Sequence, residues 1–313
     1  MSNTGQLRLT EDVDLISATT INGLLYGIAL SLFFLCVQSL YPQLKAPHLQ
    51  RQAIFILGYT SAVMICGFVY LALFTQITQL AYIDHNTSPG ELHGYEQLLY
   101  GQPIGVVLSV FNTMVDALTL GTQLWCLWVV YHATQYEIII MVLPVLLYLV
   151  GVDLQLLLLQ YPNLVSQIYS FLGSQVFIGV MNIAFQLAFT LLVTLLVIGR
   201  LLLIHRHHIK LMGATNISKL YMSIVTMFIE SYALESAWVL ASLISYIMGG
   251  IASLDFFSNC NVAIEMIAYF LVIYRVSTGR AQSKDARQQV TRSLEFNYST
   301  GYTTQTSVLG TAT

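Results

Sequence analysis

Five carboxylic acids interrupt the long apolar stretches of this 313-residue chain and are the first candidates for chemistry. They are Asp116, Asp153, Glu230, Glu235 and Glu265, and no Lys or Arg accompanies them inside those stretches. A charge at the centre of a membrane helix costs at least about 2.5–3.5 kcal/mol, so such groups mark ligand sites, ion paths and switches. We therefore expect these acids to face a protein interior, where a carboxyl group is often protonated.

Polar side chains at helical spacing run along the same stretches. Steps of four, three and four residues place one set on a single face of a helix, and a second set of this kind follows later in the chain. The side chains that we expect to form a ligand or ion pocket are Asn112, Asp116, Thr119, Gln123, Asn182, Gln186, Glu235, Trp238, Asn261 and Glu265. Lipid cannot satisfy these groups, so their faces should converge inside the bundle. For the Thr, Asn and Gln side chains, interhelical hydrogen bonds of about 0.6–2 kcal/mol each are the alternative explanation.

Glu230 and Glu235 are expected to have different roles. Five residues separate them, which is about 140° around a helix, so they should not face the same partner. Glu235 lies on a face with the character of a pocket wall, together with Ser231, Trp238 and Ser242. Glu230 lies beside small residues that permit tight packing, at Ala233, Ala237 and Ala241. We expect Glu230 to bond a neighbouring helix, and we assign it a structural role, as we do the isolated Asp153.

The positions of the histidines argue against a membrane-embedded metalloenzyme. They fall in predicted connections or at helix ends, at His48, His85, His93, His132, His205, His207 and His208. A zinc hydrolase of the membrane needs histidine ligands inside its bundle. The sequence also offers no nucleophile–base pair. We therefore expect no metal, no cofactor and no enzymatic activity.

The composition is that of an integral membrane protein. The chain is 56% hydrophobic and 9% charged, with a mean hydropathy of +0.71, whereas soluble domains average about 25% charged residues. We expect an all-α membrane protein, a bundle of seven transmembrane helices at about 18–41, 53–77, 103–130, 138–159, 174–203, 219–248 and 257–275. An extracellular tail at 1–17 precedes the transmembrane domain at 18–275, and a disordered cytoplasmic tail follows at 276–313.

The basic residues predict the orientation. Apart from Arg8, they lie in the first and fifth connections, at the adjoining helix ends or in the C-terminal tail, at Lys45, Arg51, Arg200, Arg206, Lys210, Lys219, Arg275, Arg280, Lys284, Arg287 and Arg292. Positive charge collects on the cytoplasmic side, so the N-terminus should lie outside and the C-terminus in the cytoplasm. Asn86, in a glycosylation sequon, then lies outside the cell.

This architecture resembles that of G-protein-coupled receptors, although the rhodopsin-like motifs are missing. The span at 103–130 ends without Asp-Arg-Tyr, and the spans at 219–248 and 257–275 contain no proline. The chain is more similar to an uncharacterised, receptor-like seven-transmembrane family of mushroom-forming (basidiomycete) fungi. The residues that carry this resemblance are Gly199-Arg200-Leu201, Arg206, Gly213, Tyr221, Ile224, Ile229-Glu230-Ser231, Ala233-Leu234, Tyr274-Arg275-Val276 and Gly279-Arg280-Ala281. Trp125 stands where members often carry an Arg. The resemblance implies the fold and a membrane location, but no ligand.

Two functions remain open from the sequence. The first is an orphan receptor-like protein of the plasma membrane that senses a small ligand and signals through its cytoplasmic loops. Its partners would be the lipid bilayer, an unknown small ligand, and a heterotrimeric G protein or another cytoplasmic effector, but no nucleic acid. The alternative is a proton- or cation-coupled transporter that uses Asp116, Glu235 and Glu265. No clear internal repeat is visible, which favours the receptor.

Overall fold

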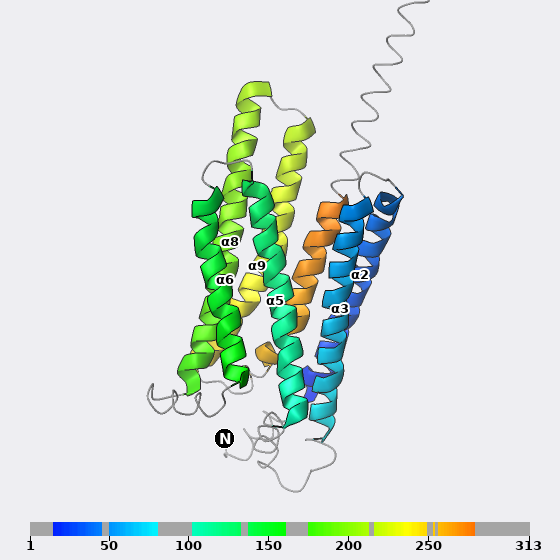
Figure 1. Ribbon diagram of the computed structural model, residues 1–313, viewed down its shortest axis with the longest axis vertical. Helices are drawn as coiled ribbons and strands as arrows, with labels where there is room; N and C mark the ends of the chain where they lie inside the picture. The colour runs from blue at the N-terminus through cyan, green and yellow to red at the C-terminus, as the bar shows by residue number, and fades with distance from the viewer. Residues whose placement is uncertain are drawn as a thin grey trace, which may run out of the picture.

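The chain folds into long helices that run side by side (Figure 1). The computed structural model describes residues 15–45, 50–80, 102–132, 137–160, 175–212, 216–248, 253 and 256–278. Within these residues the regular structure is helical, and no strand occurs. The predicted all-α class is therefore confirmed for this part of the chain.

The helix bounds follow the apolar stretches closely. The elements are η1 (Ser17–Ile21), α2 (Asn22–Leu44), α3 (Gln50–Gln79), α5 (Pro103–Tyr131), α6 (Glu137–Gln160), α8 (Gln175–Met212), α9 (Asn216–Met248) and a last helix, Phe256–Thr278. When η1 is counted as part of α2, every helix end but one lies within about three residues of the corresponding end of a predicted span. The exception is α8, which continues past residue 203 to Met212.

Six of these helices are long and apolar enough to cross a membrane: Thr19–Leu44, Gln50–Gln79, Pro103–Tyr131, Glu137–Leu156, Val180–Ile204 and Phe256–Thr278. The helix α9, which carries Lys219, Glu230 and Glu235, is not among the six. The fold is thus that of a helical, multi-pass membrane protein, with six candidate spans in the described part of the chain.

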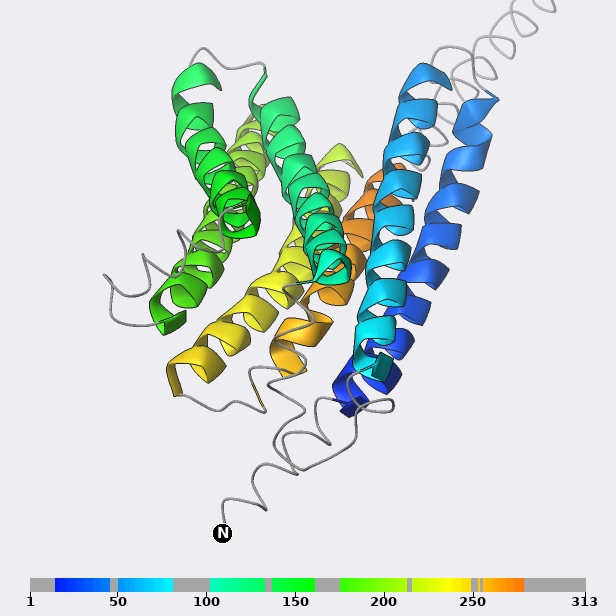
Figure 2. The ribbon, with the colours of Figure 1, turned by 60° about the horizontal axis from the view of Figure 1, so that its bottom comes forward.

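The last helix is the central element of the bundle. In its apolar window 67% of the residues are buried, compared with 6% for α6. It lies between α3 and α9 in both ribbon views (Figures 1 and 2). At Gly67 of α3, an added Cβ would collide with the sulfur of Met266, so the missing side chain lets the last helix approach α3. Met266 is 1% exposed as a result.

Apolar side chains form two separate cores around this helix. One joins α2, α3 and the last helix through residues such as Cys36, Phe74 and Phe270. The other includes side chains of α5, α8 and the last helix, such as Leu127, Phe189 and Val272. Helix α5 contributes to both cores, and its polar side chains Asp116, Thr119 and Gln123 are at most 5% exposed.

Two tyrosines hold α5 in place near Gly121. Tyr59 of α3 donates to the Leu118 carbonyl oxygen at 2.6 Å, and Tyr148 of α6 donates to that of Ala117 at 3.2 Å. A Cβ at Gly121 would lie 3.4 Å from the Tyr59 hydroxyl and 3.6 Å from the Tyr148 hydroxyl. Both distances are ordinary van der Waals contacts, so the two phenols pack directly against α5 at this level. These bonds fix the height of α5 relative to α3 and α6.

The helices α8 and α9 reach beyond their neighbours at one end of the bundle (Figure 1). They have 38 and 33 residues, or about 57 and 50 Å at 1.5 Å per residue. The hydrocarbon core of a bilayer is only about 30 Å thick. The Lys and Arg positions of the described helices lie toward this end, at Lys45, Arg51, Arg200, Arg206, Lys210, Lys219 and Arg275. We call it the basic end.

Candidate functional site

Three buried carboxyl groups lie inside the bundle, on three different helices. Asp116 of α5 is 5% exposed, Glu235 of α9 is 2% exposed, and Glu265 of the last helix is 1% exposed. Each accepts hydrogen bonds from amide or hydroxyl groups of neighbouring helices. We call the three acids and the side chains bonded to them the acid network.

Glu235 is bound by α5 and α8. The Gln123 amide nitrogen lies 3.1 Å from both carboxyl oxygens of Glu235. The Thr190 hydroxyl donates to one of these oxygens at 3.3 Å. Thr190 is fully buried, and Gln123 is 3% exposed. Glu235 therefore ties three helices together deep in the bundle.

Glu265 collects donors from three elements. Gln186 of α8 donates to its Oε1, and Asn261, one turn earlier on the last helix, donates to the same oxygen at 2.7 Å. The Thr119 hydroxyl lies 3.5 Å from Oε2. The arrangement links α5, α8 and the last helix at a second point, on the same face of α5 as Gln123.

Asp116 adds α6 to the network. Its Oδ2 accepts a bond from Gln155 of α6 at 2.9 Å and a longer one from Asn112 at 3.4 Å. Its Oδ1 is buried and receives no hydrogen bond from an amide or hydroxyl group. The carboxyl groups of Asp116 and Glu265 also interact electrostatically.

The three acids of the network have no Lys, Arg or His side chain as an ion-pair partner among the described residues. In the part of the chain that the structure describes, the two ion pairs are His132–Glu137 and Arg275–Glu230, and neither includes a network acid. No set of three or more His, Cys, Asp or Glu side chains among the described residues is arranged to hold a metal ion. Buried carboxylates without a cation are unfavourable, so the network is suited to binding protons or a cationic group.

The structure brings together eight of the ten predicted pocket residues. Each of them is one of the three acids or makes a hydrogen bond to one of them: Asn112, Asp116, Thr119, Gln123, Gln186, Glu235, Asn261 and Glu265. Trp238 lies elsewhere on α9, where its indole N–H donates to the Phe257 carbonyl oxygen at 3.1 Å and its ring packs against Phe256 and Phe257. Asn182 is half-buried on α8.

The surroundings of Glu230 differ from the prediction. The structure pairs it with Arg275 of the last helix at 2.5 Å, and 54% of its side chain is exposed. The prediction placed it deep in the span beside alanines suited to tight packing. Ala233 and Ala237 are in fact exposed. The physical reason is the length of α9, which begins outside the bundle and so brings Glu230 only to the level of Arg275, near the end of the last helix.

Asp153 is exposed on the surface of α6, so the expectation that all five acids face the protein interior is wrong at this position. The network side chain that α6 supplies is Gln155, two residues later. Sequence reasoning missed Gln155 because it concentrated on the acid. The available signal was an amide within a run of leucines, at 154 to 159. Asn86 and the tail beyond Thr278 lie outside the described residues.

Comparisons of the chain with protein-family models, with curated proteins and with solved structures found no match. Fold and site therefore define the class of protein: a helical, multi-pass membrane protein with a buried acid network.

Proposed function

We propose that this chain is a receptor-like protein of the plasma membrane, with seven spans, an external N-terminus and a cytoplasmic C-terminus. The acid network senses a small ligand. The helices α8 and α9 carry the resulting change to a heterotrimeric G protein or another cytoplasmic effector. The resemblance to the receptor-like family of basidiomycete fungi agrees with this assignment, which is otherwise an analogy from architecture.

The observation that carries the proposal is that α8 and α9 take part in the network and also protrude at the basic end. Gln186 and Thr190 bring α8 to the acids, and Glu235 brings α9. Glu235 lies 19 residues after Asn216, the first residue of α9, which is about 28 Å along the helix. Rigid helices of this length transmit a shift at the network to their protruding ends. The excess of Lys and Arg at these ends supports a cytoplasmic position for them.

A spin-label distance measurement tests this relay without knowledge of the ligand. Labels replace Val129 of α5 and Ile229 of α9, which are 46% and 43% exposed and lie outside the network. Glu235→Leu removes the acceptor that joins these two helices. We expect the distance distribution between the labels to shift in this variant, and to stay unchanged in Glu137→Gln as the control. An unchanged distribution in folded Glu235→Leu protein would contradict the relay.

A proton-coupled carrier is the second candidate, and the observation that favours it is the burial of Asp116, Glu235 and Glu265 without a basic ion-pair partner among the described residues. Buried carboxyl groups of this kind form the proton relays of pumps and transporters. Purified protein in liposomes with an internal pH-sensitive dye tests this function. Proton uptake that depends on an added solute and is lost in Asp116→Asn would favour the carrier. Absence of uptake for a broad set of solutes would leave the receptor.

A further inference from the structure

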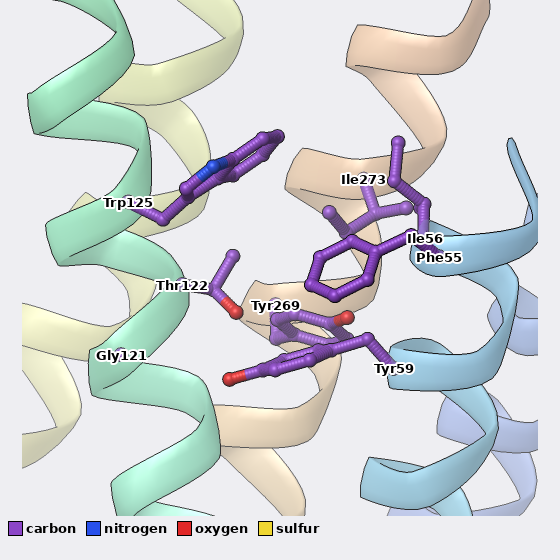
Figure 3. A pocket seen from close by; sticks show the side chains of 8 residues that line it. All are labelled: Phe55, Ile56, Tyr59, Gly121, Thr122, Trp125, Tyr269 and Ile273. Atoms are coloured by element: carbon purple, nitrogen blue, oxygen red, sulfur yellow. The ribbon is translucent and has the colours of Figure 1, made fainter. Parts of the chain in front are cut away.

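A second candidate site lies away from the acid network, between α3, α5 and the last helix. It is a cavity of about 140 Å³, and Figure 3 shows its lining side chains. Phe55 and Tyr59 come from α3, Trp125 from α5, and Tyr269 and Ile273 from the last helix. None of the predicted pocket residues lines it. Phe55 is 64% exposed and Trp125 is 38% exposed, so the cavity opens on the lipid-facing surface of the bundle.

The polar groups that line the cavity are mostly bound within the protein. The Tyr59 and Thr122 hydroxyls both donate to the Leu118 carbonyl oxygen, at 2.6 and 3.0 Å. The Tyr269 hydroxyl lies 3.4 Å from the hydroxyl of Thr60. An occupant therefore finds an apolar interior, and an apolar cavity of this size does not hold water. The indole N–H of Trp125 is the other polar group of the lining, and it suits an ester carbonyl at the opening.

The size and shape of the space favour part of a flexible chain. An apolar cavity of about 150 Å³ holds a molecule the size of benzene, which is far smaller than a four-ring sterol. A narrower crevice of about 20 Å³ shares Ile56, Trp125 and Ile273 with the cavity and extends it to Gln43 and Ser277. Gln43 lies near the end of α2 and Ser277 near the end of the last helix, so the crevice leads toward the basic end. An acyl chain matches an elongated, apolar space of this kind.

A basic residue, Arg51, lies on the same face of α3 as the cavity residues Phe55 and Tyr59. Arg51, Phe55 and Tyr59 follow each other on α3 at steps of four residues, which places them on one side of the helix. Each step is about 6 Å along the axis. Arg51 is exposed, and neither of the two ion pairs of the described residues includes it. A phosphate one helical turn from Phe55 would meet its guanidinium.

We propose that this groove binds an anionic glycerophospholipid from the bilayer leaflet at the basic end. One acyl chain fills the space among Phe55, Ile56, Tyr59 and Trp125, and the phosphate pairs with Arg51. The lipid would also contact Tyr269, which lies one turn after Glu265 on the last helix. The site is separate from the acid network and does not depend on whether the chain is a receptor or a carrier.

Quenching of Trp125 fluorescence by lipids with brominated acyl chains tests the proposal. The full chain is placed in nanodiscs, with Trp128→Phe and Trp238→Phe so that Trp125 alone reports. We expect brominated phosphatidylglycerol to quench at about fivefold lower mole fraction than brominated phosphatidylcholine, because one Lys or Arg near the surface gives an anionic lipid a preference of that size. Arg51→Gln should remove this preference, whereas Arg206→Gln, at an exposed arginine of α8, should keep it.

A matched pair of α3 variants tests the groove itself. Ile56→Phe fills the cavity, and Ile54→Phe places the same side chain at a position that is 54% exposed and does not line it. Quenching should fall only in Ile56→Phe. Native mass spectrometry of the chain with its three tryptophans intact provides a second measurement, in which one phosphatidylglycerol should remain bound after delipidation and be lost in Ile56→Phe. Equal quenching by both headgroups, equal behaviour of the two α3 variants, or displacement by a sterol would overturn the proposal.

Discussion

Two replacements of Glu235 test the network most directly, because Leu removes its hydrogen bonds and its acidic group whereas Gln removes only the acidic group. Glu235→Leu leaves the buried amide nitrogen of Gln123 without its acceptor. Thr190 loses a bond too, but a threonine on a helix can donate to a backbone carbonyl one turn earlier instead. One buried donor without a partner costs about 1–3 kcal/mol. This lowers the equilibrium preference for the folded state by roughly 5- to 150-fold.

Glu235→Gln should behave differently. The new amide oxygen can accept the bond from Gln123, and the new amide nitrogen supplies a donor. The Gln123 side-chain oxygen is buried and has no hydrogen-bond partner, so it is the natural acceptor for that donor. A reciprocal amide pair would then replace a bond from one amide to a carboxyl group. We therefore expect Glu235→Gln to be at least as stable as the parent.

Unfolding free energies measured in bicelles, supported by thermal melts in detergent, provide the assay. Glu230→Leu is the control on the same helix, because its ion pair is largely exposed and such pairs contribute about 0–1 kcal/mol. The double variant Gln123→Leu/Glu235→Leu should recover part of the loss, since it removes both partners of the bond. The reasoning is refuted if Glu235→Leu unfolds like the parent, or if the double variant is destabilised by the sum of both single changes.

Three further outcomes follow from other parts of the structure. Gly121→Ala should melt no lower than Gly151→Ala, a glycine with nothing near its Cβ, because a methyl group at 121 makes only ordinary van der Waals contacts with the Tyr59 and Tyr148 hydroxyls and alanine favours a helix; a clearly lower melt would contradict this. Gln155→Leu should destabilise the fold by about 1–3 kcal/mol, since Asp116 loses its shortest bond, and Asp116→Leu in the same background should reduce that loss when unfolding is measured. A tag after Thr313 should resist protease added to intact cells, and its digestion would overturn the orientation inferred from the basic residues.

The sequence was sufficient to predict the helices and one face of the site. Apolar length alone placed almost every helix end, because a bilayer demands about 20 apolar residues for each span. The spacing of Asp116, Thr119 and Gln123 predicted a buried face on α5, and these three residues are at most 5% exposed. Periodicity within one helix is enough for such a prediction, since lipid forces polar groups inward.

Pairing between helices could not be predicted in the same way. It depends on the height and rotation of each helix relative to its neighbours, which no local pattern records. The amide of Gln155 stands out within its run of leucines, but its bond to Asp116 could be predicted only by knowing that α6 turns Gln155, and not Asp153, toward α5. The Tyr59 and Tyr148 bonds to the α5 backbone are equally invisible, because a carbonyl acceptor has no sequence signature.

The two largest departures from prediction have one physical origin. The prediction ended α8 at residue 203, whereas α8 continues to Met212, and α9 starts only four residues later. The first turns of α9 therefore lie beyond the bundle, and every residue of α9 sits nearer the basic end than a count from the membrane surface suggests. Glu230 consequently reaches Arg275 near the end of the last helix, while Glu235 lies at the depth of Gln123. The length of α8 and α9 thus explains why Glu230 reaches an exposed ion pair, and the offset of about 140° between the two glutamates explains why Glu235 faces the buried network instead.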